Sequence, residues 1–226
     1  TAPGLICRKD GKIVVALPGP KNEFVPMVEG PVKDLLREVA GGTVIHSRIV
    51  RVCGAGEALI EEKIRKLIDQ EDPTVAPYAK LAEVHLRVTT RAATREEAEA
   101  KIGPTVDQIR RILGEHVYGY DETTLEDSVL DLLRQRHQKV AVAESCTGGG
   151  LGARITAVPG SSDVLTGGVI AYSNEVKQEM LEVSPLTLLT EGAVSSDACA
   201  QMALGVRRKF EADFGVAITG IAGPGG

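Results

Sequence analysis

The apolar positions of this chain change their spacing along the sequence, and residues 1–42 are the first segment that they define. Residues 5–7 and 13–17 are short apolar runs on either side of Lys9-Asp10-Gly11-Lys12, and Asp-Gly between two such runs predicts a β-hairpin. Residues 32–40 have the spacing of a short helix. One hairpin and one helix make a poor core, so we expect the tail of a larger domain or an appendage packed on its neighbours.

Residues 43–119 have the pattern of a compact α+β unit. The apolar spacing predicts, in order, a strand at 44–52, a helix at 59–68, a half-buried strand at 82–88 and a helix at 98–112. Asp72-Pro73 and Ala76-Pro77 mark a loop before the second strand. Gly103-Pro104 is expected to kink the last helix or to split it in two.

This small unit with a glycine-rich turn invites comparison with KH modules, which bind nucleic acids, and its residues compare poorly. Gly54-Ala55-Gly56-Glu57 is not a Gly-x-x-Gly loop, and it follows a strand instead of joining two helices. The formal net charge is −5, with no Trp, three Phe and four Tyr, so a basic surface and aromatic stacking platforms are not expected. We therefore expect no nucleic-acid partner and no attraction to an anionic membrane.

From residue 120 onward, helical and strand patterns alternate, which is typical of an α/β fold. The expected strands are 140–143, 165–172 and 215–219, and the expected helices are 125–133, a helix ending at about 157, 175–183 and 197–210. Thr123-Thr124-Leu125-Glu126 resembles a capping box, Asn174 is placed to cap the third helix, and Ser195 or Ser196 the fourth. Three strands that end on the glycine-rich residues 220–226 make an unfinished sheet. We expect further residues or another chain to complete it, and we expect a homodimer.

The most informative stretch is residues 140–150, VAVAESCTGGG. An apolar strand ends in two adjacent candidate nucleophiles, Ser145 and Cys146, followed by three glycines and a helical pattern. Such a turn can hold an anion on backbone N–H groups, stabilise an oxyanion, or do both. Simpler interpretations stay open: the turn only cradles a phosphate, Cys146 is a small buried residue, and Glu144 is either an acid or a hydrogen-bond acceptor for the turn.

Polar residues follow each of the three expected strands: Ser145-Cys146-Thr147, Tyr172-Ser173-Asn174 and Thr219-Gly220. Ligands of open α/β sheets bind beyond the carboxyl ends of the strands, so we expect these residues to share one crevice. Thr219 could equally be no more than the end of its strand.

Ser145 needs a base to act as a nucleophile at neutral pH. The four histidines lie outside the strand-end loops, which argues against a Ser-His-Asp triad: His46, His85, His116 and His137. The nearest basic candidate is Lys177, because removal from water lowers the pKa of a lysine. Tyr172 is placed to relay the proton or to hold the lysine. The alternatives are a solvated surface lysine and a tyrosine that belongs to the core.

The cysteines lie far apart and form no Cys-x-x-Cys pair: Cys7, Cys53, Cys146 and Cys199. This spacing argues against a zinc site and a disulfide framework, and it suits a reducing cytoplasm. No apolar run approaches the roughly 20 residues that a membrane span needs, and no signal peptide opens the chain. We expect a cytoplasmic protein.

Five motifs together resemble the CinA family, the competence- and damage-inducible proteins. They are Ala143-Glu144-Ser145-Cys146-Thr147-Gly148-Gly149, Pro159-Gly160-Ser161-Ser162, Gly168-Val169-Ile170-Ala171-Tyr172-Ser173-Asn174-Glu175-Val176-Lys177, Glu191-Gly192-Ala193-Val194-Ser195 and Thr219-Gly220-Ile221-Ala222-Gly223-Pro224. The similarity is to the carboxyl-terminal nicotinamide mononucleotide deamidase domain of that family. It implies a three-layer α/β fold for residues 120–226.

The resemblance extends over the rest of the chain. Residues 17–24, LPGPKNEF, look like the end of the family's amino-terminal domain, which is related to molybdopterin-binding proteins. Residues 1–42 would then be the tail of that domain, and residues 43–119 would correspond to the family's KH-like connecting domain. In some members the amino-terminal domain hydrolyses ADP-ribose, a reaction that a divalent metal would serve.

The resemblance implies hydrolysis of the carboxamide of nicotinamide mononucleotide to nicotinate mononucleotide and ammonia, in pyridine nucleotide salvage. Ser145 would attack the carbonyl with Lys177 as general base, assisted by Tyr172, and this chemistry needs no metal or other cofactor. The residues that would contact the substrate are Cys146, Thr147, Gly148, Gly149, Asn174, Thr219, Gly220 and Gly223. Two alternatives are a metal-dependent ADP-ribose pyrophosphatase acting through the amino-terminal domain and a non-catalytic nucleotide-binding module.

Overall fold

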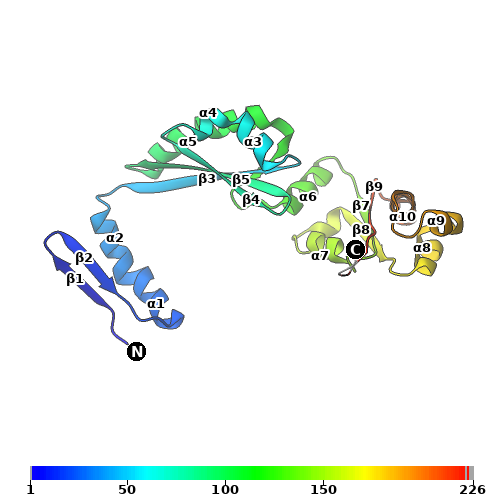
Figure 1. The fold of residues 1–226 in the computed structure, drawn as a ribbon, viewed down its shortest axis with the longest axis horizontal. Helices are drawn as coiled ribbons and strands as arrows, with labels where there is room; N and C mark the ends of the chain where they lie inside the picture. The colour runs from blue at the N-terminus through cyan, green and yellow to red at the C-terminus, as the bar shows by residue number, and fades with distance from the viewer. Residues whose placement is uncertain (1, 222, 224–226) are drawn as a thin grey trace. The chain divides into compact units, whose positions relative to one another are not determined.

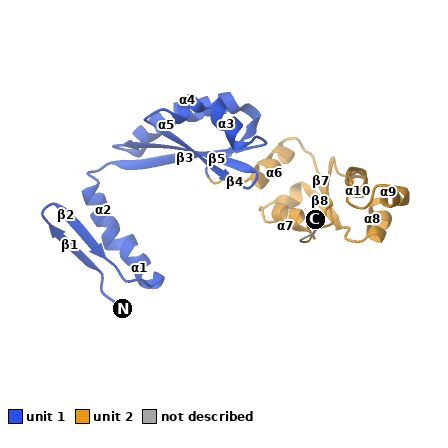
Figure 2. Cartoon of the chain, viewed as in Figure 1, with its two compact units in different colours: residues 1–121 blue, residues 122–226 orange. Residues whose placement is uncertain are grey.

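The computed structural model of the chain describes residues 2–221 and 223, and it divides into two compact units, residues 1–121 and 122–226 (Figure 2). Among the described residues, no helix is both long and apolar enough to cross a membrane.

The first unit begins with the expected hairpin, β1 (Leu5–Lys9) paired antiparallel with β2 (Lys12–Ala16). Asp10 and Gly11 both have positive φ, 49° and 72°, as the tight turn of a twisted hairpin requires. The expected helix is α2 (Lys33–Val39), and it follows two elements that the apolar spacing did not predict, α1 (Lys21–Met27) and a π-helical turn, η1 (Val28–Val32).

Residues 44–120 form a four-stranded antiparallel sheet in the order β4-β5-β3-β6. Its elements are β3 (Val44–Cys53), α3 (Glu57–Lys63), α4 (Arg65–Ile68), β4 (Thr74–Lys80), β5 (Glu83–Ala92), α5 (Arg95–Leu113), the short 3-10 turn η2 (Gly114–His116) and β6 (Val117–Tyr120). The helices cover one face of the sheet (Figure 1). Val50, Leu86 and Val88 alternate inward from the strands and share a core with Ile60 and Ile109 of the helices.

Two expectations for this segment were wrong and a third was wrong in part, each for a local reason. The loop expected at Ala76-Pro77 is part of β4, an edge strand, where a proline without an N–H group is tolerated. The split expected at Gly103-Pro104 does not occur, since α5 continues through Pro104, which lies on the exposed face where water can reach the carbonyl that loses its amide partner. The alternative, a kink, stays a prediction. The helix expected at 59–68 divides at Ile64, where φ and ψ of −107° and 17° leave the helical region.

Among its described residues, the second unit contains eight helices and strands and a short 3-10 turn. They are α6 (Leu125–Gln135), β7 (Val140–Glu144), α7 (Gly150–Thr156), η3 (Ser161–Asp163), β8 (Leu165–Ile170), α8 (Asn174–Leu181), α9 (Pro185–Thr190), α10 (Ser196–Lys209) and β9 (Phe214–Ile218), with η3 as the 3-10 turn. The strands form a parallel sheet in the order β8-β7-β9, so β7 is the central strand. The expected α/β unit is confirmed, and α9 is the element that was not predicted.

The side chains of β7 alternate between two cores, which makes the unit three-layered. Val140 and Val142 pack with Leu133 of α6 and Ile155 of α7. Ala141 and Ala143 pack on the other face with residues of α8 and α10: Leu181, Ala198, Met202 and Val206. Strand positions of period two therefore point Glu144 toward α7 and Ser145 toward α8.

The helix caps lie close to the expected positions. The capping box before α6 uses Thr124 and Asp127, one residue later than the predicted Thr123 and Glu126. Ser173, and not Asn174, caps α8, since its hydroxyl accepts a hydrogen bond from the Val176 amide at 3.3 Å. Ser195, one of the two predicted alternatives, caps α10.

Candidate active site

The carboxyl ends of β8, β7 and β9 lie side by side, and the polar residues that follow them are brought together. The register pairs Glu144 with Ile170 on one side and with Ile218 on the other. Two further backbone hydrogen bonds continue it, from the Ala171 amide to the Glu144 carbonyl at 2.7 Å and from the Ser145 amide to the Ile218 carbonyl at 2.9 Å. Ser145 is thus fixed at the centre of the sheet edge.

Lys177 of α8 lies against Ser145 inside the protein. The distance from Lys177 Nζ to Ser145 Oγ is 3.0 Å, and the exposed fractions of the two residues are 2% and 6%. Lys177 Nζ also donates to the backbone carbonyls of Ala171 at 2.7 Å and Tyr172 at 3.3 Å. Helix α8 follows β8 directly, and its first turn carries the lysine back over the strand end.

The surroundings of Lys177 favour its neutral form. Burial lowers the pKa of this amine from its ordinary value of 10.5, and the charge of Cys146 nearby, once its thiol ionises, acts in the opposite direction. A neutral amine has two hydrogens and one lone pair. In the structure Nζ donates to Ser145 Oγ as well as to the carbonyls of Ala171 and Tyr172. In the neutral amine the two carbonyls can accept the two hydrogens, and the lone pair can then accept the Ser145 hydroxyl.

Glu144 lies on the opposite face of β7 and accepts hydrogen bonds from the turn. It is 1% exposed, and its carboxylate accepts from the amides of Leu151 at 2.9 Å and Gly152 at 2.8 Å. Burial opposes ionisation, but hydrogen bonds from the Thr147 hydroxyl and the amides of Gly152, Leu151 and Gly149 together hold the pKa of Glu144 below its usual value. Of the two sequence interpretations, the hydrogen-bond acceptor fits this geometry.

The glycine turn uses most of its own amides. Gly148 and Gly149 have positive φ of 60° and 102°, conformations that favour glycine. The Gly148 amide donates to the Ser145 carbonyl, and the Gly150 amide donates to the Thr147 carbonyl, both at 3.0 Å. Within the part of the chain that the structure describes, the amides of Cys146 and Thr147 are the ones in this turn without a protein acceptor.

The other residues expected to contact substrate differ in their exposure and in their partners. Tyr172 contributes its carbonyl to Lys177, while its residue is 69% exposed. Asn174 and Thr147 are exposed, whereas the Thr219 hydroxyl donates to the Ala193 carbonyl at 2.8 Å. Gly220 lies against Cys146, because a Cβ built there would be 2.9 Å from Cys146 Sγ.

Gly223 is exposed, and no atom of the described residues lies within 4 Å of a Cβ built on it. Ala222 and Pro224, which belong to the same motif, and the glycines at 225 and 226 lie outside the described residues.

Comparison with known proteins agrees with this architecture. Residues 122–226 match the family model described as the CinA C-terminal domain, and residues 47–119 match the model of the damage-inducible protein CinA KH domain. The chain belongs to the CinA family.

Relatives in the CinA family are similar over the whole chain. A CinA-like protein of Dictyoglomus thermophilum is 48% identical over 227 residues, which are 100% of this chain and 55% of that protein. A CinA-like protein of Thermosynechococcus vestitus is 49% identical over 228 residues, again 100% of this chain and 55% of the relative. The chain therefore spans about half the length of these curated relatives.

Solved structures of CinA-type proteins cover less of the chain. The competence/damage-inducible protein CihA of Agrobacterium tumefaciens is 43% identical, over 45% of this chain and 62% of that one, with a TM-score of 0.44. A competence- or damage-inducible protein of Enterobacter asburiae is 32% identical, over 46% of this chain and 67% of that one, with a TM-score of 0.44.

The CinA KH domain departs from the loop that nucleic-acid-binding KH modules use. A single residue, Ile64, separates α3 from α4, and no Gly-x-x-Gly sequence stands there. The family of the domain is shown, and the absence of a nucleic-acid partner stays a prediction.

Sequence reasoning did not anticipate one part of the site, and it gave the Glu144 interactions only as one of two alternatives. The Ala171 carbonyl, which holds Lys177, lies near the end of the strand expected at 165–172 and carries no side-chain signal. The Glu144 interactions depend on the amides of residues seven and eight positions later. The alternation of β7 was the available signal, because it assigns Glu144 and Ser145 to opposite faces.

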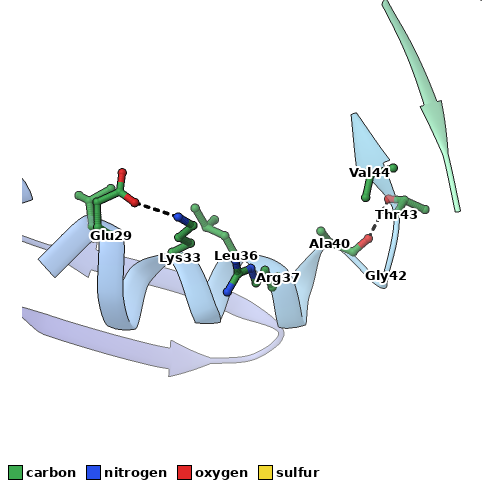
Figure 3. Close-up of a pocket in the computed structure, with 9 residues that line it drawn as sticks. Glu29, Lys33, Leu36, Arg37, Ala40, Gly42, Thr43 and Val44 are labelled. Atoms are coloured by element: carbon green, nitrogen blue, oxygen red, sulfur yellow. Dashed lines mark hydrogen bonds and ion pairs between the residues drawn. The ribbon is translucent and has the colours of Figure 1, made fainter. Parts of the chain in front are cut away.

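A separate pocket in the first unit, about 530 Å³ in volume, carries a different chemistry (Figure 3). It is lined by η1, α2 and the turn into β3. Its cations are paired, Lys33 with Glu29 at 2.9 Å and Arg37 with Asp34 at 3.2 Å. Among residues 2–221 and 223, no three His, Cys, Asp or Glu side chains are grouped so that they could hold a metal ion.

Proposed function

We propose that the second unit hydrolyses the carboxamide of nicotinamide mononucleotide, with Ser145 as nucleophile and Lys177 as general base. The contact between a buried lysine amine and a buried serine hydroxyl, 3.0 Å apart, carries this proposal. Membership of the CinA family supports the reaction class, and the choice of substrate rests on the resemblance to the family's deamidase domain.

In the first half-reaction, neutral Lys177 removes the proton from Ser145 as Oγ attacks the carboxamide carbon. The carbonyl π electrons move to oxygen, and the amides of Cys146 and Thr147 are the donors available for this oxyanion. As the tetrahedral intermediate collapses, Lys177 returns the proton to the departing nitrogen. Ammonia leaves, and an ester joins Ser145 to the nicotinoyl group.

In the second half-reaction, a water molecule takes the place of ammonia. Lys177 accepts a proton from the water as its oxygen attacks the ester carbon, and it then protonates the departing Ser145 Oγ. The products are nicotinate mononucleotide and the original enzyme. The anchoring of Lys177 by two backbone carbonyls keeps the amine in position through both proton transfers.

The substrate contacts proposed here are those of the strand-end loops. Thr147 and Asn174 are exposed polar residues close in sequence to Ser145 and Lys177, and Tyr172 is an exposed aromatic residue. Nicotinamide mononucleotide carries a pyridinium cation, for which an aromatic face is a suitable neighbour. We also retain the expectations of a homodimer and of a cytoplasmic enzyme that needs no metal or other cofactor.

The test is release of ammonia from nicotinamide mononucleotide by the full-length protein and two single variants. Ser145→Ala should abolish release, and Cys146→Ala should retain it, because the thiol has no part in the proposed proton transfers. Loss of turnover in Cys146→Ala with turnover in Ser145→Ala would assign the nucleophile to Cys146. Binding of the mononucleotide with no turnover by the unmodified protein would identify a binding module.

A further inference from the structure

Glu144 is a buried carboxylate that the proposed chemistry does not consume. Its partners are dipoles: the amides of Leu151 and Gly152 at 2.9 and 2.8 Å, the Gly149 amide and the Thr147 hydroxyl. A carboxylate removed from water is retained only where such hydrogen bonds replace its hydration. The residue therefore has a specific structural relationship with the turn that follows Ser145.

The Glu144 carboxylate binds the C-terminal end of the turn, where the chain enters α7 and no longer pairs with the sheet. The backbone of Glu144 is fixed in the sheet, because its carbonyl accepts from the Ala171 amide at 2.7 Å. Its side chain crosses to the first turn of α7 and binds amides seven and eight residues later. Residues 145–149 are enclosed between these two anchors, and Ser145 is the first of them.

The same interactions decide which amides remain for a substrate. The amides of Gly149, Leu151 and Gly152 are taken by Glu144, and those of Gly148 and Gly150 by carbonyls of the turn. A substrate anion would have to displace a buried carboxylate to reach the start of α7. Within the described residues, the amides of Cys146 and Thr147 remain.

We propose that Glu144 is a positioning residue, which acts as a built-in anion and holds the turn so that Ser145 stays within reach of Lys177 while the Cys146 and Thr147 amides stay open. This role rests on the proposed amide hydrolysis. It involves no contact between Glu144 and the substrate, since β7 points Glu144 and Ser145 to opposite faces of the sheet.

The first test replaces the carboxylate by an amide of the same shape, Glu144→Gln. One of its two terminal atoms can no longer accept from Leu151 or Gly152, so the turn relaxes. We expect kcat to fall about 100-fold, the loss that a displacement of ~1 Å causes at a reacting group. KM should change much less, because the lost alignment acts in the transition state. Titration with a fluorophosphonate counts the molecules whose Ser145 is reactive. Dividing the rate by this number gives a kcat that does not change when part of the sample is unfolded.

Thr147→Val supplies a second variant that does not threaten the fold, because Thr147 is exposed. It removes the hydroxyl that donates to Glu144 and keeps the Thr147 amide. We expect kcat to fall about 10-fold, the low end of the value of one hydrogen bond to a charged group. In the Glu144→Gln background the same change should have no further effect on kcat, since both changes break one unit, while loss of a substrate contact of Thr147 would appear in KM. Effects on kcat that multiply would overturn the proposal, because they would mean that the Thr147 hydroxyl acts on turnover independently of Glu144.

Glu126→Gln is the matched control. The Glu126 carboxylate also binds α7, through Arg154, but it lies at the far side of that helix from the turn. Its loss should leave kcat and the rate of fluorophosphonate labelling unchanged. If kcat falls equally in Glu126→Gln and Glu144→Gln, Glu144 only stabilises α7 in a general way. This result would overturn the proposal.

Labelling of Ser145 separates this inference from the proposed function. If the unmodified protein is labelled at Ser145 but releases no ammonia from nicotinamide mononucleotide, the substrate assignment fails, while the labelling rate of Glu144→Gln still tests the positioning role. If Glu144→Gln is folded and keeps both the labelling rate and kcat of the unmodified protein, the positioning role is refuted and the hydrolysis stands.

Discussion

Lys177 Nζ lies 3.0 Å from Ser145 Oγ, although 32 residues separate the two in the chain, and both are buried. Parallel pairing of β7 with β8 brings their carboxyl ends together, and α8 returns the lysine over that edge. An imidazole is not needed in this arrangement, because a desolvated amine can accept the proton of a serine.

The rate should fall at low pH as Lys177 becomes protonated. Only the neutral amine accepts a proton, so kcat/KM should rise with pH through the lowered pKa of Lys177. Cys146→Ala should leave this acid limb in place, because a protonated thiol carries no charge that could act on the amine. A kcat/KM that stays constant as pH falls would contradict neutral Lys177 as the base.

Replacement of Lys177 should make the fold more stable at neutral pH. The pKa of Lys177 is lower in the folded state than in the unfolded state, so the unfolded chain binds more protons and the folded state loses stability as pH falls below 10.5. Lys177→Met removes this cost. Thermal melting at pH 7 should show a higher Tm for Lys177→Met than for the unmodified protein, and the difference between the two Tm values should narrow as pH approaches 10.5. A Tm difference that is constant with pH would show that Lys177 is charged in the folded protein.

Tyr172 should act through its ring on the substrate and not on the lysine. Its carbonyl, which every residue type retains, holds Lys177, while the residue is 69% exposed. Tyr172→Ala should therefore raise KM for the mononucleotide about 5-fold, the value of an aromatic contact with a cation. The acid limb of the pH profile should be unchanged. An acid limb that moves in Tyr172→Ala would support the proton-transfer role that the sequence suggested for the Tyr172 side chain.

The contact between α8 and α10 should tolerate no side chain at Gly205. A Cβ built there would be 2.0 Å from the Leu181 carbonyl oxygen, at the end of the helix that carries Lys177. Gly205→Ala should destabilise the second unit by about 1–3 kcal/mol, the usual cost of overpacking. Gly103→Ala in α5 is the control, since apart from its chain neighbours nothing lies within 4 Å of its Cβ. The helical gain of about 0.5–1 kcal/mol is offset by crowding of the new Cβ against the Pro104 ring, so the net change in stability should be small. Chemical denaturation measures both, and equal effects would contradict the close helix contact.

The parts of the fold that carry strong periodicity were predictable. The apolar run at 140–143 and the glycines after it indicated strand, turn and helix, and the structure has β7 and α7 there. Tyr172 and Lys177 were placed near Ser145 because polar residues after parallel strands meet at one edge. The backbone carbonyl of Tyr172, and not its hydroxyl, makes the contact, a distinction that no pattern of residue types contains.

Elements that depend on their neighbours were not predictable. β4 contains Pro77 and reads as a loop until its place at the sheet edge is known. β6 is four residues long and includes Gly119, so its sequence has little strand propensity. Its pairing with β3 stabilises it as a strand. The N-caps at Thr124 and Ser173 lie one residue away from the expected positions. Adjacent residues can both serve as caps, and the backbone geometry determines which of them does.

The most direct measurement is mass spectrometry of the protein quenched during turnover of nicotinamide mononucleotide. The acyl-enzyme intermediate carries the nicotinoyl mononucleotide as an ester. It therefore adds the mass of this group to the peptide that contains Ser145 and Cys146. The account predicts that fragmentation places this mass on Ser145 and that Lys177→Met does not accumulate it. The same mass on Cys146, or ammonia release that leaves neither residue modified, would contradict the proposed serine nucleophile.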